Sequence, residues 1–236
     1  MCGRFTLANP ARIAAAFDLV MPIPELQPRY NIAPSQLVAV VWNAEGNGLR
    51  ELTGLTWNLL PSWARPGDRA FAMNAKAETL RDKPSFRTLI KTRRCLIPAD
   101  GYYEWTAAKR KKTPWHIRLK DGGLMGFAGL WDMWTDGTKI VRTCCLITTA
   151  ANEVARTIHE RMPLIIPRLQ FDAWLDPATP VPAVDAMLSS PFPADEMEVI
   201  PANPLANGTK IEGPELLVAD PRMLKIPASQ PGLFDG

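Results

Sequence analysis

The sequence predicts an α+β protein of a single domain, with a largely antiparallel, β-barrel-like core and peripheral helices. Many short runs of apolar, β-branched and aromatic residues are separated by turn residues, whereas few stretches carry apolar residues at helical spacing. Strands and helices do not alternate along the chain, which argues against a parallel α/β sheet. The 236 residues, 47% of them hydrophobic, suffice for one large domain with its own core.

The predicted strands are runs of apolar or alternating character that end at Gly, Pro, Asn or Asp. They cover Phe5–Leu7, Gln36–Trp42, Glu51–Trp57, Cys95–Pro98, Tyr102–Trp105, Trp115–Leu119, Leu124–Trp134, Ile140–Thr148, Leu164–Ile166 and Glu198–Ile200. Two hairpins are expected. The basic run Lys109–Lys112 closes one, and the turn Thr135-Asp136-Gly137 closes the other.

Four helices are predicted between these strands. Asn9-Pro10 is typical of an N-cap followed by Pro in the first turn, and places Ile13 and Phe17 on one buried face. Thr149 is expected to cap a second helix that runs through His159. Leu169–Leu175 and Ala183–Leu188 are shorter. The domain is expected to span residues 1–214, and the Pro-rich residues 215–236 form a flexible tail.

The net charge and the cysteines limit which partners, metal sites and cell compartment can be expected for this protein. A net charge of +3, with basic residues concentrated in 81–94, permits a nucleic-acid partner without requiring one. The four Cys form no C-x-x-C pair and His is scarce, so no ordinary zinc site is expected. Cys144 and Cys145 lie in an apolar run typical of core residues. Unpaired thiols, with no signal peptide or membrane span, predict a cytoplasmic protein that does not bind membranes.

The N-terminal Met1-Cys2 is the first candidate for chemistry. Removal of Met1 would leave Cys2 with an α-amine and a thiol on adjacent carbons. An amine condenses with an aldehyde to an imine, and the neighbouring thiol can close on the imine carbon to form a thiazolidine. Ordinary pKa values of about 7.7–8.0 for the amine and about 8.5 for the thiol make both groups reactive near neutrality. The alternative is an incidental Cys at a frayed end.

Glu104 and His159 are candidates for proton transfer. Glu104 lies between aromatic residues in Tyr-Tyr-Glu-Trp, where apolar surroundings would raise its pKa; the alternative is a solvent-facing Glu on an alternating strand. His159 falls near the predicted end of a helix, whose dipole favours the imidazolium; the alternative is a helix-end His without a task. His116 lies in an alternating strand and is expected to be structural.

Three further residues could contact a ligand. Asn74 lies in a loop-like segment where its amide could anchor a substrate oxygen or only shape a turn. Trp57 and Trp63 offer flat faces for base stacking, although either could belong to the core. The run Lys109–Lys112 is typical of a solvated hairpin tip.

Six segments together resemble the SOS response-associated peptidase (SRAP) family. They occur in the family's order over most of the chain: Met1–Phe5, Arg29–Pro34, Leu60–Trp63, Asn74–Thr79, Arg93–Trp105 and His159–Pro163. The resemblance implies a single α+β domain around a barrel-like core. It also implies binding of single-stranded DNA and covalent trapping of abasic sites through the N-terminal cysteine.

The resemblance assigns a catalytic role to Cys2, Asn74, Glu104 and His159. It assigns DNA contacts to Arg4, Arg29, Trp63, Lys76, Arg87 and Arg161. Two positions depart from the family pattern: Lys76 replaces the usual Arg, which keeps the charge but loses the bidentate fork, and Asn58 replaces a Gly. No metal or organic cofactor is implied, and a monomer is expected. Weak lyase activity at abasic sites and reversal of the crosslink are implied as side reactions.

Other functions stay open on the sequence alone. An N-terminal Cys beside a base is also the arrangement of N-terminal-nucleophile peptidases, which would cleave their own Met1 or other proteins. A non-enzymatic single-strand binder is the third possibility. In the tail, Gln230, Leu233 and Phe234 are spaced like the anchors of short peptides that bind replication sliding clamps; a disordered end without a partner is the alternative.

Overall fold

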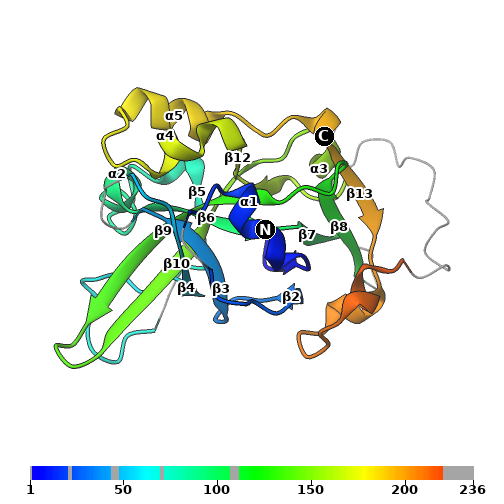
Figure 1. Cartoon of the computed structure of the whole chain (residues 1–236), viewed down its shortest axis with the longest axis horizontal. Coiled ribbons are helices and arrows are strands. Elements are labelled where there is room, and N and C mark those ends of the chain that lie inside the picture. The colour runs from blue at the N-terminus through cyan, green and yellow to red at the C-terminus, as the bar shows by residue number, and fades with distance from the viewer. Residues whose placement is uncertain (1, 21–22, 44–47, 70–71, 107–111, 220–236) are drawn as a thin grey trace, which may run out of the picture.

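Five strands close into a barrel in the computed structural model, which describes residues 2–20, 23–43, 48–69, 72–106 and 112–219 (Figure 1). They are β3 (Leu37–Trp42), β4 (Glu51–Trp57), β6 (Arg94–Ala99), β9 (Met125–Thr135) and β10 (Ile140–Ala150). Four of the five pairings, β4–β3, β3–β6, β6–β9 and β9–β10, are antiparallel. The parallel pairing of β10 with β4 closes the ring. The predicted fold class is confirmed, with one parallel seam.

The barrel is filled by large apolar side chains. Trp57, Leu55 and Phe127 are fully buried, and every residue of β6 is buried, as expected for a strand covered on both faces. Phe5 packs into the same core, with its ring centroid 5.3 Å from that of Trp57. Each such side chain contributes about 1.5–3 kcal/mol of hydrophobic stabilisation relative to an exposed position.

A second, antiparallel sheet carries the N-terminus. Its order is β13 (Met197–Pro201), β8 (Thr113–Leu119), β7 (Gly101–Thr106), β1 (Phe5–Leu7) and β2 (Arg29–Ile32). β1 is therefore an inner strand, paired on both sides. Asp100, between β6 and β7, accepts hydrogen bonds from the backbone N–H groups of Ala8 and Asn9. The start of the chain is tied into the sheet rather than frayed.

The helices are short and lie around the two sheets. They are η1 (Pro10–Arg12), α1 (Ile13–Ala16), η2 (Ala77–Thr79), α2 (Leu89–Thr92), α3 (Glu153–Arg156), η3 (Arg168–Gln170), α4 (Phe171–Leu175), α5 (Val181–Ser189), η4 (Ala194–Glu196), η5 (Pro204–Asn207) and η6 (Pro214–Leu217). Three short strands complete the fold: β5 (Asn74–Lys76), β11 (Arg161–Pro163) and β12 (Ile165–Ile166). Among the described residues, none of the helices has the length and apolarity to cross a membrane.

The predicted helix from Thr149 to His159 is wrong over most of its length. β10 continues to Ala150, and Thr149 pairs with Met162 of β11. The helix that does form, α3, is a single turn capped by Asn152, whose Oδ1 accepts a hydrogen bond of 2.9 Å from Ala155 N. Strand pairing competes successfully for Thr149, and His159 lies beyond the end of α3. A helix dipole acting on His159 is therefore not supported.

Two local features concern the expected N-cap and the expected end of the domain. Asn9 occupies the N-cap position of η1 with Pro10 in the first turn, as predicted, but its side chain makes no capping bond; its Nδ2 donates instead to Asp100 Oδ1 (2.7 Å). η6 spans the predicted domain boundary at residue 214 and buries Leu216 in a small cluster with Tyr103, so packed structure continues at least to Leu217. Most of the tail, with the clamp-like residues Gln230, Leu233 and Phe234, lies outside the described residues.

Candidate functional site

Cys2, the first described residue, is fully buried just before β1. The next residues are held by β7: Arg4 O accepts a hydrogen bond of 2.9 Å from Tyr103 N, and Phe5 pairs with Tyr102. The thiol lies 3.9 Å from Arg4 O, a weak contact. The pairing of β1 thus fixes the position of the Cys2 main chain to which the nucleophiles are attached.

Asn74 fixes Cys2 from the barrel side. β5 runs parallel to β10, where Asn74 pairs with Leu146, and this pairing presents its amide to the N-terminus. Asn74 Nδ2 donates a hydrogen bond of 2.7 Å to Cys2 O. Asn74 Oδ1 is buried and accepts no hydrogen bond from the described residues. A buried acceptor left open in this way is costly unless another group uses it.

Glu104 of β7 is buried, and burial raises the pKa of its carboxyl, while the positive charge of His159 acts in the opposite direction. Burial likewise raises the pKa of the Cys2 thiol well above its usual range, and the charge of Glu104 raises it further. Glu104 affects the pKa of the Cys2 thiol and His159 affects the pKa of Glu104, so the three side chains lie near one another. The solvent-facing alternative for Glu104 is excluded.

Tyr102 joins this neighbourhood, and sequence reasoning missed it. Its hydroxyl is buried with no hydrogen-bond partner among the described residues. Burial raises its pKa, with further contributions from Cys2 and Glu104. The available signal was spacing, because Tyr102 and Glu104 are two residues apart on one strand and so share a face.

His159 lies in the connection between α3 and β11 and is half-buried. Its backbone N–H donates to Ala155 O (3.1 Å), and its Nδ1 accepts a hydrogen bond of 2.9 Å from Arg161 N. With Nδ1 occupied as an acceptor, the neutral ring carries its proton on Nε2. The neutral imidazole is therefore fixed in one tautomer, with Nε2 as its donor.

Arg161 is engaged within the protein. Its guanidinium forms a bidentate pair with Glu78, at 2.5 and 3.0 Å, and donates to Thr148 O at 2.7 Å. The Arg161 side chain is only 13% exposed, and its hydrogen bond lowers the pKa of Glu78. A DNA phosphate would have to share Arg161 with this carboxylate.

Arg4 also has internal partners. Its Nη1 donates to Asn31 Oδ1 (2.6 Å) and to the carbonyls of Ala206 (3.0 Å) and Gly208 (3.2 Å), while its guanidinium lies over the Trp105 ring at 5.4 Å. These bonds tie the segment before β1 to the C-terminal residues 204–208.

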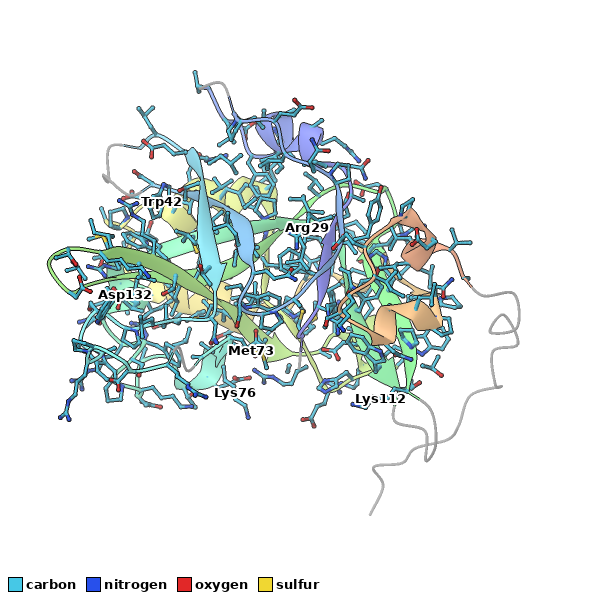
Figure 2. The ribbon with its side chains drawn as sticks, turned by 90° about the horizontal axis from the view of Figure 1, so that it is seen from below. Arg29, Trp42, Met73, Lys76, Lys112 and Asp132 are labelled. Carbon is cyan, nitrogen blue, oxygen red and sulfur yellow. The ribbon has the colours of Figure 1, made fainter. Side chains whose placement is uncertain are left out.

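The other predicted contacts differ in their exposure. Arg29 is half-buried and donates to Gln36 Oε1 (2.5 Å), whereas Lys76 and Arg87 are exposed. Figure 2 shows Lys76 at the edge of the molecule. Trp63 is 63% exposed, whereas Trp57 is fully buried and its Nε1 donates to Met73 O (2.8 Å). Of the two tryptophans considered for base stacking, only Trp63 is exposed.

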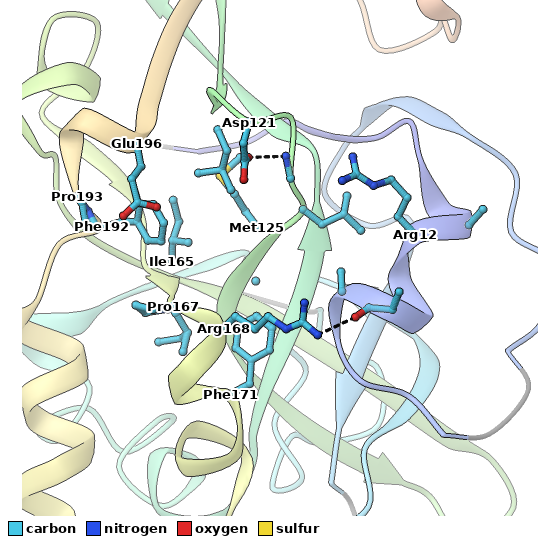
Figure 3. A pocket seen from close by; sticks show the side chains of 18 residues that line it. Arg12, Asp121, Met125, Ile165, Pro167, Arg168, Phe171, Phe192, Pro193 and Glu196 are labelled. Carbon is cyan, nitrogen blue, oxygen red and sulfur yellow. Dashed lines mark hydrogen bonds between the residues drawn. The ribbon is translucent and has the colours of Figure 1, made fainter.

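Two cavities among the described residues are not lined by the four catalytic candidates. The first, of about 650 Å³, lies among α1, β12 and α4, and its lining includes the charged residues Arg12, Arg168, Asp121 and Glu196 (Figure 3). The second, of about 560 Å³, is an apolar hollow beside β3 and β4. Within the described residues, no group of three or more His, Cys, Asp or Glu side chains could hold a metal ion.

The remaining cysteines and His116 behave as expected of core residues. Cys95, Cys144 and Cys145 are free and fully buried, and burial raises their pKa values. His116 is buried with its Nε2 3.0 Å from Thr6 Oγ1. What distinguishes Cys2 among the thiols is its proximity to Glu104 and Asn74.

Comparison with known proteins identifies the same family as the sequence motifs. The family described as SOS response associated peptidase (SRAP) matches residues 1–208. The chain is 41% identical over 223 residues to the abasic site processing protein YoqW of Bacillus subtilis, covering 92% of this chain and 99% of that protein. It is 26% identical over 224 residues to the abasic site processing protein YedK of Escherichia coli, with coverage of 92% and 99%.

A solved structure of a protein from Bacteroides thetaiotaomicron shares the fold, with a TM-score of 0.82 at 24% identity, covering 93% of this chain and all of that one. A phage-related protein from Bordetella bronchiseptica matches with a TM-score of 0.69 at 27% identity, covering 86% of this chain and 94% of that one. Because the family match extends over most of the sequence, the chain belongs to the SOS response-associated peptidase (SRAP) family.

Proposed function

We propose that this protein processes abasic sites in single-stranded DNA by joining Cys2 covalently to the sugar aldehyde. The observation that carries the proposal is a buried Cys2 whose carbonyl is held by Asn74 and whose thiol is coupled to Glu104. Relatives named as abasic site processing proteins support this choice of substrate.

The reaction begins at the α-amine of Cys2, exposed once Met1 is removed. We assign the first attack to the amine, because burial and the charge of Glu104 raise the pKa of the thiol and so disfavour the thiolate. The amine attacks C1′ of the open aldehyde, and water leaves to give an imine. Sγ then bonds to C1′ and the thiol proton passes to the nitrogen. The product is a five-membered thiazolidine, with one water lost overall.

Each neighbouring side chain has a part in this sequence. Glu104, with its raised pKa, accepts and returns protons as the closed sugar opens. Asn74 holds Cys2 through its amide and offers Oδ1 to the sugar. His159 transfers protons during ring opening and can assist reversal of the adduct. Holding amine and aldehyde together supplies the effective concentration that favours attack.

The DNA contacts are proposed on the exposed side chains Lys76, Arg87 and Trp63, with Arg4, Arg29 and Arg161 in supporting positions. Such a surface would bind without sequence preference and weaken with added salt. With DNA as its substrate, the protein would act in the cytoplasm, at the nucleoid. Lyase activity follows where the imine eliminates before the ring closes. Clamp binding through Gln230, Leu233 and Phe234 stays a prediction.

One gel tests the proposal. The mature protein is incubated with single-stranded DNA that carries one abasic site, then separated under denaturing conditions. Wild type should give a covalent band that is absent in Cys2→Ala and absent when one residue is retained before Cys2. Cys2→Ser should lose the stable product but still give an imine that borohydride traps.

Three results would overturn the proposal. A wild-type protein of confirmed N-terminus that yields no covalent band would exclude the crosslink. Cleavage of peptides by wild type but not by Cys2→Ala, again without a DNA adduct, would instead favour the peptidase alternative. A plain mobility shift that is insensitive to Cys2 would leave only a single-strand binder.

A further inference from the structure

The loop Leu60–Ala64 presents Trp63 on the surface while its own backbone is fastened to the barrel. Three hydrogen bonds hold alternate loop residues: Leu60 N donates to Thr143 Oγ1 (2.9 Å), Ser62 N donates to Asp132 Oδ2 (2.8 Å), and Ala64 O accepts from Trp134 Nε1 (2.7 Å). Both neighbours of Trp63 in the chain are thus fixed. The loop cannot swing without breaking bonds to the barrel.

The three anchoring side chains share one face of the β9–β10 hairpin. Asp132 and Thr143 are directly opposite each other across the two strands, and Trp134 follows Asp132 by two residues. Because side chains alternate along a strand, these three point to the same side. All three are buried, although Trp63 is 63% exposed. The longest hairpin of the barrel therefore serves as the support for this loop.

Asp132 is the most firmly held of the anchors. Beyond its bond to Ser62, its Oδ1 accepts from Met133 N (2.8 Å) and pairs with the Arg93 guanidinium. Arg93 lies over the Trp131 ring at 5.1 Å, which limits its own movement. Figure 2 shows Asp132 at the end of the molecule formed by this hairpin. A buried carboxylate with charged and neutral donors is a fixed acceptor rather than a mobile surface charge.

We propose that Thr143, Asp132 and Trp134 are positioning residues that hold Trp63 as a preformed stacking platform for one base of the single strand. The inference rests on the proposed function and adds a binding role for the hairpin face. Stacking on an indole tolerates any base, in keeping with sequence-independent binding. A platform fixed before binding loses little conformational entropy when the base arrives, so the anchors act on affinity.

Two variants that leave the charge unchanged test this role. Thr143→Val removes the acceptor for Leu60 N at nearly constant shape, and Trp134→Phe removes the donor to Ala64 O but keeps a ring. Each should raise the Kd for an unmodified single strand about threefold, and Trp63→Ala should raise it about tenfold. At subsaturating abasic DNA, the crosslinking rate should fall in the same order as the affinity.

A double-mutant cycle separates positioning from general loosening of the fold. In a Trp63→Ala background, adding Thr143→Val should change the Kd no further, because the platform is already absent. Thr138→Val is the matched control: Thr138 is on the same hairpin but bonds Asp136 in its turn, so binding should not change. Thermal unfolding of each variant verifies the fold, and Trp134→Phe serves if Thr143→Val does not fold.

Wild-type affinity in both Thr143→Val and Trp134→Phe would overturn the inference. So would an equal weakening by Thr143→Val with and without Trp63. The two proposals can fail separately. A wild-type protein that binds single strands through Trp63 but never crosslinks would refute the proposed reaction and leave the platform supported. A wild-type protein that crosslinks, but whose affinity does not change in the anchor variants, would support the reaction and refute the platform.

Discussion

Glu104 of β7 and His116 of β8 are both buried titratable residues in the same sheet, yet their surroundings differ. Burial disfavours the charged form of each, so the pKa of Glu104 is raised and the pKa of His116 is lowered to about 3. Both side chains are therefore held toward their neutral forms. A shifted pKa alone does not tell a reactive group from a structural one.

The neighbours make the distinction. Glu104 interacts electrostatically with the thiol of Cys2 and with His159, the groups to which the proposed proton transfers are assigned. His116 instead contacts Thr6 at 3.0 Å and packs against the Tyr103 ring, with centroids 5.1 Å apart. A Cβ at Gly101 would lie 2.4 Å from the His116 ring, so the imidazole fills the space that a side chain would need. His116 serves packing, whereas Glu104 has the neighbours that the proposed proton transfers need.

The largest expected effect comes from Glu104→Gln. The variant keeps the shape but cannot accept a proton, and the crosslinking rate should fall about 100-fold or more, as for loss of a general base. The wild-type rate should decrease as pH falls through the raised pKa of Glu104, because the carboxylate is the working form. The variant should lose that dependence. Single-turnover crosslinking rates over a pH range of about 5 to 8 measure both effects.

Glu198→Gln is the matched control for this change. Glu198 on β13 is partly exposed and pairs with Arg118. The crosslinking rate and pH profile of the Glu198→Gln variant should therefore equal those of wild type. A Glu104→Gln protein with the wild-type rate, or with an unchanged pH profile, would remove Glu104 from the proposed proton transfers.

His116→Gln should change stability rather than rate. The folded pKa of about 3 is below the ordinary value of 6.5, so the unfolded state binds the proton first as pH falls. The stability that the neutral His116 contributes is complete above about pH 6.5 and is lost progressively toward about pH 3, with a limiting slope of about 1.4 kcal/mol per pH unit. Denaturant unfolding at several pH values should show a shallower dependence in the variant.

Any packing that Gln loses should lower the free energy of unfolding by the same amount at every pH. The slope of that free energy against pH therefore reports on the titration of His116 alone. Equal slopes in the two proteins would mean that His116 is not held neutral by the fold. A large fall in the crosslinking rate of a folded His116→Gln protein would contradict the assignment of a purely structural role to His116.

Lys76→Arg is expected to have the smallest effect. Lys76 is exposed on β5, where an Arg could bind a phosphate through two N–H groups, so the Kd for single-stranded DNA should fall about twofold. The charge is unchanged, and the dependence of the Kd on salt should keep its slope. Lys120→Arg, in the connection after β8, is the control and should leave both unchanged. A weaker affinity in Lys76→Arg would argue against a phosphate at this position.

The sequence predicted strands better than helices because the strands here are long apolar or alternating runs with clear turns. The hairpin of β9 and β10 was expected almost as it is, whereas α3 was not. Thr149 has the side chain of a capping residue, but its backbone pairs with Met162, a partner that no local pattern identifies. Long-range pairing decided where the strand ends.

The site residues were predictable as candidates, but their contacts were not. Nothing near Arg161 in the sequence indicates that Glu78, 83 positions away, neutralises it. Arg4 likewise finds its partners at Ala206 and Gly208, 202 and 204 positions later. Which basic side chains are exposed to a phosphate depends on such pairings, and these follow only from the fold.

The intact mass of the product formed by mature wild type and a single-stranded oligonucleotide with one abasic site tests the central claim most directly. The proposed reaction predicts a single adduct equal to the protein without Met1 plus the DNA, less one water, with Cys2 as the modified residue. The thiazolidine should resist borohydride. An unmodified protein, or an adduct attached anywhere other than Cys2, would contradict the account.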